Sequence, residues 1–140
     1  MTSRQANWSA LLTPPGAGAI GVVRVGGPDA AEIVARAFRP RSGRPLTELD
    51  TNRLRYGRFV DGEETLDDVL VGRVPESREP TFDICTHGGV RIAERVLQTL
   101  ERHGAPFRTM SDPELLFPPP YLRPRPMIES EALAALARAK

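Results

Sequence analysis

The stretch TPPGAGAIGVVRVGGP, residues 13–28, decides between two folds. It holds Gly16, Gly18 and Gly21 in the pattern G-x-G-x-x-G, which also marks dinucleotide-binding βαβ units. In those units a helix begins directly after the glycines, and its N-terminus holds the pyrophosphate. Here residues 22–25 (VVRV) are mostly β-branched and predict a strand. The sequence therefore predicts a glycine loop between two strands, whose backbone can approach a ligand closely.

On both sides of this loop, the hydrophobic pattern predicts five strands and three helices. Strands are expected at residues 8–12, 20–25, 52–60, 66–74 and 81–86, and helices at 28–38, 90–103 and 129–139. Asp61-Gly62 predicts a hairpin between the third and fourth strands. Residues 107–110 allow one more strand.

The two better-defined helices carry recognisable start and stop signals. Pro28 and Asp29 predict the first turn of one helix. The other is expected to end at Gly104, and its apolar face is Val90, Ala93, Val96, Leu97 and Leu100.

Composition restricts the function. The chain has 140 residues, enough for one domain, and a net charge of +1. One cysteine, Cys85, fits a reducing compartment, and the apolar runs are too short to cross a bilayer, so we expect a cytoplasmic protein without membrane contact. Two histidines and one cysteine make a metal site improbable.

Nucleotide hydrolysis at a P-loop is excluded for this chain. The P-loop motif G-x-x-x-x-G-K-[ST] needs a lysine that reaches the terminal phosphates. The one lysine of this sequence is Lys140, its last residue.

Three stretches together resemble one family: TPPGAGAIGVVRVGGPDA, LDDVLVGRVPESREPTFDICTHGGV and ESEALAAL. They are similar to the N-terminal domain of the tRNA-modification GTPases of the MnmE/TrmE type, most clearly over residues 8–105. The resemblance implies an α+β fold, a small mixed β-sheet with helices packed on it, like the folate-binding domain of aminomethyltransferases. It also implies a homodimer that binds formyl-tetrahydrofolate.

In the full-length family, the folate supplies a one-carbon unit for modification of the wobble uridine of tRNA, together with an FAD-dependent partner protein. We therefore expect residues 1–126 to form a stand-alone or excised N-terminal domain. Residues 127–140 are expected to form a C-terminal helix that starts a helical domain.

The resemblance places the folate-binding arginine of the family at Arg24 and the strand acid at Asp83, where the family usually has glutamate. Arginine can pair with a carboxylate or carbonyl through its planar fork, and a carboxylate can accept hydrogen bonds from the pterin edge. For both residues the alternative is a solvated strand face.

His87-Gly88-Gly89 also matches the family. Two glycines at a helix start leave backbone N–H groups accessible to a negatively charged group, and Gly21 belongs to the loop that supplies further backbone donors. The alternative is that Gly88 and Gly89 only permit close packing of strand and helix.

The sequence departs from the family near its end. The family has a lysine-containing P-G-E-F segment that contributes to the folate site, and this chain has TMSDPELLFPPPYLRPRP instead, with Arg123 and Arg125 as the candidates to replace the lysine. The proline-rich part, residues 117–126, is expected to be an extended strap, although its PPPY also matches a WW-domain ligand. The departure and Asp83 favour the alternative function, a dimerisation scaffold that has lost folate binding.

Overall fold

The computed structural model describes residues 7–12, 21–46, 53–75 and 77–108. They form a six-stranded sheet in the order β1-β2-β6-β5-β4-β3, with two helices. The strands are β1 (Trp8–Leu11), β2 (Gly21–Gly26), β3 (Phe38–Pro40), β4 (Leu54–Asp61), β5 (Glu64–Arg73) and β6 (Thr81–Thr86), and the helices are α1 (Ala30–Ala37) and α2 (Val90–Arg102). The predicted α+β class is confirmed.

All pairings between these strands are antiparallel, and an isolated bridge between Ser9 and Phe107 adds one parallel contact. That bridge is all that the described residues show of the strand expected at 107–110. The glycine loop before Gly21, the proline-rich segment 117–126 and the expected helix 129–139 lie outside the described residues.

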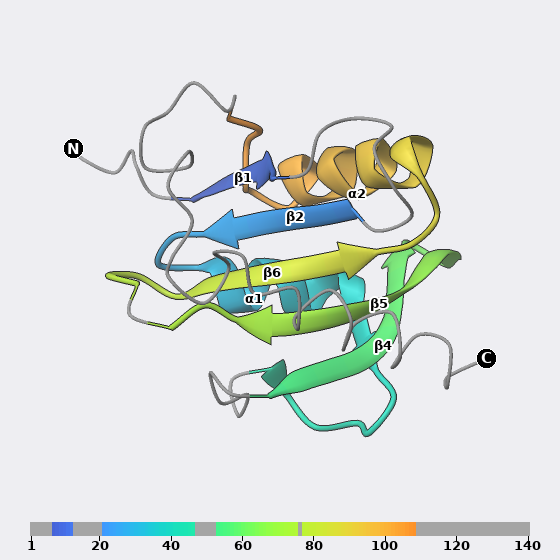
Figure 1. Ribbon diagram of the computed structural model, residues 1–140, viewed down its shortest axis with the longest axis horizontal. Helices are drawn as coiled ribbons and strands as arrows, with labels where there is room; N and C mark the ends of the chain where they lie inside the picture. Colours follow the sequence, from blue (N-terminus) through green and yellow to red (C-terminus); the bar gives the residue numbers. More distant parts are fainter. Residues whose placement is uncertain (1–6, 13–20, 47–52, 76, 109–140) are drawn as a thin grey trace.

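Both helices cover the same face of the sheet, behind it in the view of Figure 1. The core on that face combines alternate strand residues with the apolar sides of the helices: Val23, Val25, Phe59, Val69, Val71, Phe82, Ile84, Ile33, Val34, Val96 and Leu100. Because side chains alternate along a strand, the residues between these point to the other face. The helix-free face therefore carries Arg24, Asp83 and Cys85.

Two details of the helices differ from the prediction. Helix α1 begins at Ala30 instead of Pro28, because Asp29 is its N-cap and the Asn7 side chain binds both the Asp29 amide (2.9 Å) and its carboxylate (3.1 Å). In α2 four of the five residues expected on the apolar face are buried. Val90 is 41% exposed because it is the first residue of the helix. Gly104 follows α2 with a φ of 112°, as a helix-ending glycine does.

Two strand features were also only partly predicted. The short strand β3 follows α1 without a break and was not predicted: Phe38 was expected to end the helix, and three residues carry too little pattern to indicate a strand. The predicted hairpin of β4 and β5 is confirmed. Asp61 pairs with Glu64, so its tight loop is Gly62 and Glu63, one residue later than expected.

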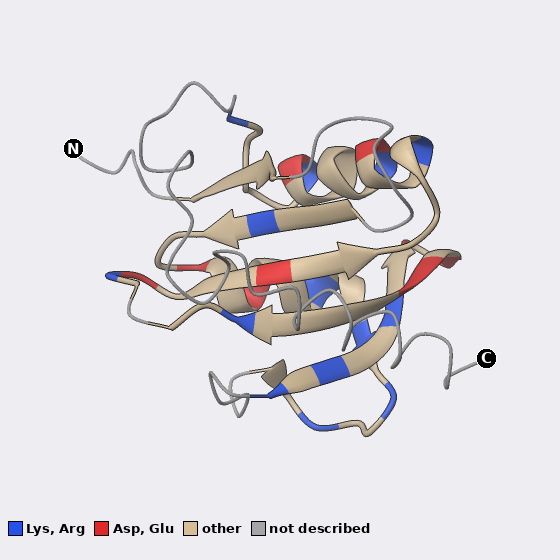
Figure 2. Ribbon diagram, in the orientation of Figure 1, with Lys and Arg blue, Asp and Glu red and all other residues tan. Residues whose placement is uncertain are grey.

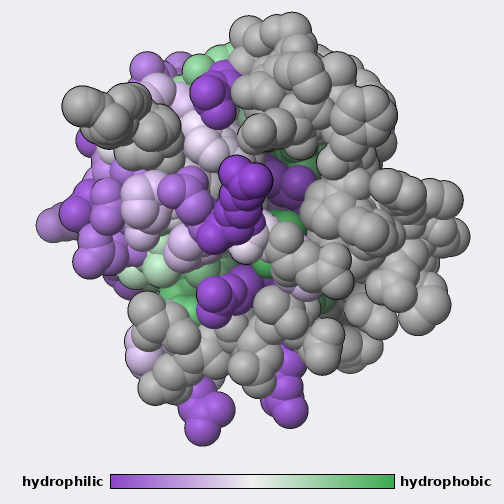
Figure 3. Space-filling view, turned by 90° about the vertical axis from the view of Figure 1, so that its left-hand side faces the viewer, coloured by the Kyte–Doolittle hydropathy of each residue, from purple (hydrophilic) through white to green (hydrophobic). Residues whose placement is uncertain are grey.

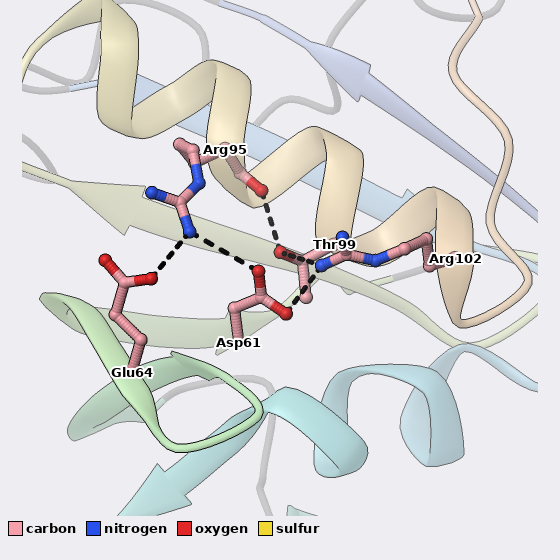
Figure 4. A network of polar contacts seen from close by, with 5 residues as sticks. All are labelled: Asp61, Glu64, Arg95, Thr99 and Arg102. Atoms are coloured by element: carbon pink, nitrogen blue, oxygen red, sulfur yellow. Dashed lines mark hydrogen bonds and ion pairs between the residues drawn. The ribbon is translucent and has the colours of Figure 1, made fainter.

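A polar network ties the tip of this hairpin to α2 (Figure 4). Arg95 contacts Glu64 (2.9 Å) and Asp61 (3.4 Å), and Arg102 contacts the second Asp61 oxygen (2.6 Å). Arg102 also donates to the Thr99 hydroxyl, which in turn donates to the Arg95 carbonyl oxygen (2.8 Å). The network fixes the β4–β5 tip on the helix.

The described surface is largely polar at the end of the molecule where the β5–β6 connection lies, with a smaller hydrophobic patch among the hydrophilic side chains (Figure 3). None of the described helices is long and apolar enough to cross a membrane.

Candidate functional site

The pairing of β2 with β6 brings the residues singled out in the sequence into one region. Arg24 stands directly opposite Asp83, and Gly21 stands opposite Thr86, the residue before His87. Three strand positions separate the two pairs, which is about 10 Å along the ladder. The glycine turn into α2 therefore lies at one end of the strand pair whose middle holds the two charged side chains.

Arg24 and Asp83 form a two-point ion pair. Nε of Arg24 donates to Oδ1 of Asp83 at 2.8 Å, and Nη2 donates to Oδ2 at 3.0 Å. The two residues are only 4% and 6% exposed, so the alternative of a solvated strand face is wrong for both. Figure 2 shows a basic position on β2 beside an acidic position on β6, in agreement with this pairing.

Small residues flank this pair on both sides in the same cross-strand row. Ala10 of β1 is opposite Arg24, and Gly72 of β5 is opposite Asp83. Neither neighbour has a side chain long enough to cover the pair. The Leu54 side chain leans over Gly72 so closely that an added Cβ would lie 2.8 Å from its Cδ2.

His87 is held by Asp67 of β5, which is itself 8% exposed. The Asp67 carboxylate accepts from the His87 backbone N–H (2.8 Å) through one oxygen and lies 2.9 Å from Nδ1 through the other. The Asp68 carbonyl oxygen also lies 3.2 Å from Nδ1. Because two acceptors face Nδ1, this nitrogen carries the proton, which leaves Nε2 as the acceptor of the neutral ring.

The two positions before α2 require glycine for different reasons. Gly89 is the N-cap at φ 91° and ψ −174°, a backbone conformation open essentially to glycine alone. At Gly88 an added Cβ would collide with the side chain of Ile92 in the first turn of the helix that follows, so the close approach here is to α2 itself and not between strand and helix. Among the described residues no side chain caps α2, and the first turn of the helix contains no acidic residue.

Sequence reasoning missed Asp67 and Thr86. Asp67 belongs to the quoted LDD motif, but nothing local in the sequence shows that it reaches a residue twenty positions later. Thr86 is fully buried, and its hydroxyl has no hydrogen-bond partner in the described part of the chain. A buried polar group of this kind is unusual in a folded protein. Its neighbourhood, Gly21 and the turn into α2, is where the sequence placed backbone donors.

Within the described ranges, no group of three or more histidine, cysteine, aspartate or glutamate residues could hold a metal ion. The candidates to replace the missing family lysine, Arg123 and Arg125, lie outside the described residues.

Known proteins similar to this chain agree with the resemblance. The family model for the GTP-binding protein TrmE N-terminus matches residues 8–111. A tRNA modification GTPase MnmE of Christiangramia forsetii is 45% identical over 97 residues, which are 66% of this chain and 20% of that protein. Those of Streptococcus agalactiae and Streptococcus thermophilus are each 37% identical, over 94% of this chain and 29% of their own length. The chain therefore spans less than a third of these relatives, and it belongs to the TrmE N-terminal family.

Proposed function

We propose that this domain binds a reduced folate, formyl-tetrahydrofolate, and associates with a second copy of itself. The observation that carries the proposal is the buried Arg24–Asp83 pair, since a buried ion pair is seldom the most stable filling of a strand position. Its two members are the residues to which the family resemblance assigns the arginine and the acid of the folate site. A ligand-binding role accounts for charges that stability alone does not require.

The contact geometry suggests separate roles for the two side chains. The Asp83 carboxylate is the group that can accept hydrogen bonds from the amino-pyrimidinone edge of a pterin, because each of its oxygens has more than one lone pair. Arg24 fixes the plane of that carboxylate through two parallel contacts. In this role Arg24 is a positioning residue for Asp83.

The turn before α2 is suited to a negatively charged part of the ligand. The first backbone N–H groups of a helix have no partner within the helix, and the helix dipole favours an anion there. Gly88 and Gly89 keep this end clear of side chains, and the Asp67 carboxylate fixes the backbone of His87 beside it. We assign Gly21, His87, Gly88 and Gly89 to this part of the site.

In the whole protein, the folate would serve tRNA modification together with an FAD-dependent partner protein, as the family resemblance implies. The relatives are named as tRNA modification GTPases, and this chain covers only the part that matches their N-terminal family model. We place the activity in the cytoplasm, where the tRNA substrate is found, with residues 1–126 as the folate domain and 127–140 as the helix that follows.

The second candidate function is a dimerisation scaffold without a ligand. One observation favours it: both oxygens of Asp83 are already engaged by Arg24, so the pair is satisfied without a folate. The two functions share self-association and differ only in ligand binding.

Calorimetric titration with formyl-tetrahydrofolate tests the proposal. Wild type is expected to bind, and the double variant Arg24→Met/Asp83→Leu is expected to lose at least about tenfold in affinity while remaining folded. The matched control is Glu64→Leu/Arg95→Met, which removes an exposed pair of the same charges between the β4–β5 hairpin and α2 and should bind like wild type.

A third variant, Asp83→Glu, restores the residue that the family usually has, beside the small cross-strand neighbours Ala10 and Gly72. We expect tighter binding. If neither wild type nor Asp83→Glu releases heat at millimolar folate while sedimentation equilibrium still shows a dimer, the scaffold function replaces the proposal. A monomer at high concentration contradicts both functions.

A further inference from the structure

A second polar site lies at the opposite edge of the sheet, where β3 pairs with β4. It is a pocket of about 360 Å³ that we call the arginine pocket, lined by Arg39, Pro40, Arg41, Tyr56, Gly57, Arg58 and Asp68. A volume of this size suits a small organic ligand. Figure 2 shows basic positions along β4 and in the connection before it.

The pocket exists because β3 and β4 approach very closely. Gly57 makes this possible, since a Cβ there would collide with the backbone of Arg39 and Pro40. The Arg41 N–H then donates to the Tyr56 carbonyl oxygen (2.9 Å), which fixes the backbone that carries Arg41. The Arg41 guanidinium lies 5.6 Å from the centre of the Tyr56 ring, within the range of a cation–π contact.

The three arginines of the pocket differ in the contacts that they make. Arg39 is engaged, because it donates to the carbonyl oxygens of Ala35 and Arg36 at the end of α1. Arg58 stands directly opposite Asp68, yet within the described part of the chain neither Arg58 nor Arg41 forms an ion pair. Both side chains are exposed.

Asp68 is the acidic residue of the pocket, and it acts on Tyr56. Burial, and next the Asp68 carboxylate, raise the pKa of the Tyr56 hydroxyl above its usual value. Within the described residues Asp68 forms no ion pair with Arg41 or Arg58, and its carboxylate is a hydrogen-bond acceptor in the lining of the pocket. An anion would be repelled by Asp68 and attracted by the two arginines.

We propose that the arginine pocket binds a nucleotide, either free or within an RNA strand. The phosphate would lie on Arg58 and Arg41, since the planar guanidinium matches phosphate oxygens. The base would stack on the Arg41–Tyr56 surface, as bases do on arginine and aromatic side chains. Asp68 would accept a hydrogen bond from a base N–H. This site is separate from the folate proposal and does not depend on it.

The test is the fluorescence anisotropy of a labelled ten-residue oligouridylate titrated with the 140-residue chain, in competition with uridine monophosphate, inorganic phosphate and a glutamate peptide. We expect binding that Arg41→Ala and Arg58→Ala each weaken about two- to fivefold. If the arginines bind phosphates of the RNA strand, each substitution also makes the slope of log K against log salt concentration less steep by about 0.7.

Three control variants sharpen the test. Arg91→Ala removes an exposed arginine of α2, on the other side of the sheet, and should bind like wild type. Tyr56→Phe should bind, whereas Tyr56→Leu should not, because only phenylalanine retains a stacking face. Thermal unfolding of each variant shows whether the fold is retained.

The outcomes separate the sources of the nucleotide and the alternatives. If uridine monophosphate binds as tightly as the oligouridylate does per nucleotide, the result supports a free nucleotide as the ligand. If the oligouridylate binds clearly more tightly, the result supports an RNA strand. Absence of binding, an equal effect of Arg91→Ala, or equal competition by inorganic phosphate or the glutamate peptide would overturn the proposal.

Discussion

Arg24 and Asp83 face each other across the β2–β6 ladder and are joined by two parallel contacts of 2.8 and 3.0 Å, with both residues more than nine-tenths buried. Removing one partner leaves the other as an unpaired buried charge. We expect Arg24→Ala to lower the free energy of unfolding by about 3–5 kcal/mol.

The paired replacement Arg24→Met/Asp83→Leu should instead leave stability unchanged or raise it by about 1–4 kcal/mol, because similar volumes fill the same place without charge. Urea denaturation of both variants measures the difference. If Arg24→Ala is as stable as wild type, the pair contributes far less than its burial indicates.

The contacts of Asp67 with His87 predict a change of histidine tautomer. In Asp67→Asn the side chain offers only one acceptor oxygen, so it can no longer accept from both the backbone N–H and Nδ1–H of His87. If the oxygen keeps the backbone N–H, the amide NH₂ faces Nδ1, where only the Asp68 carbonyl oxygen remains as an acceptor. We expect a loss of about 1–3 kcal/mol in stability and a shift of the ring proton toward Nε2. Nitrogen NMR of the ring at mildly alkaline pH reports the tautomer.

The matched control is Asp68→Asn, since Asp68 meets the ring through its backbone carbonyl. This variant should keep the proton on Nδ1. A wild-type ring that already carries its proton on Nε2 would contradict the assignment.

Acid stability should depend on Asp61. The hydrogen bond from Arg102, together with the charges of Arg102 and Arg95, lowers the pKa of the Asp61 carboxyl below its usual 3.8. A folded-state pKa below the unfolded one means that the unfolded chain binds more protons in this range, so stability rises with pH there. The stabilisation by the ionised Asp61 carboxylate is therefore present above about pH 4, and it is lost as the pH falls through the pKa of this group in the folded protein.

Asp61→Asn should therefore be less stable than wild type at neutral pH, and the two proteins should converge in strong acid. Thermal unfolding across this pH range measures the convergence. Added salt should shrink the neutral-pH difference, because Arg102 is exposed and Asp61 and Arg95 are partly exposed. If the stability difference between wild type and Asp61→Asn is the same at the lowest pH, the difference comes from packing and not from the charge of Asp61.

The backbone of Gly89 predicts a cost for any side chain at the start of α2. With φ at 91° and ψ at −174°, Gly89→Ala should lower the free energy of unfolding by about 1–3 kcal/mol. Gly62 in the β4–β5 loop has φ 62°, a value that asparagine adopts readily, so Gly62→Asn is the control and should change stability little. Equal effects at both positions would contradict the argument.

Much of the architecture could be predicted because its signals are local. The β-branched run after Gly21 identified β2, and alternation with a turn signal identified the β4–β5 hairpin. The three-residue strand β3 carried no pattern of its own. It exists because Gly57 lets the chain after α1 lie against β4, a contact between segments seventeen residues apart.

The candidate site was predicted in its residues and not in its contacts. Arg24 in an apolar strand required a partner or solvent, but pairing with Asp83 depends on the register of two strands 59 residues apart, which no local pattern encodes. Asp67 was missed for the same reason. Whether these residues bind folate stays a prediction, since burial and pairing describe the protein alone.

The first strand is secured by the last part of the described chain. Ser9 donates from its backbone to Pro106 (2.9 Å) and from its hydroxyl to Ala105 (2.9 Å), and its carbonyl oxygen accepts from Arg108 (2.7 Å). During synthesis on a ribosome, these contacts on the outer edge of β1 therefore cannot form until about a hundred further residues have been made. Such distant contacts slow folding, so a nascent chain halted before α2 should expose the β1 edge and be the form most in need of a chaperone.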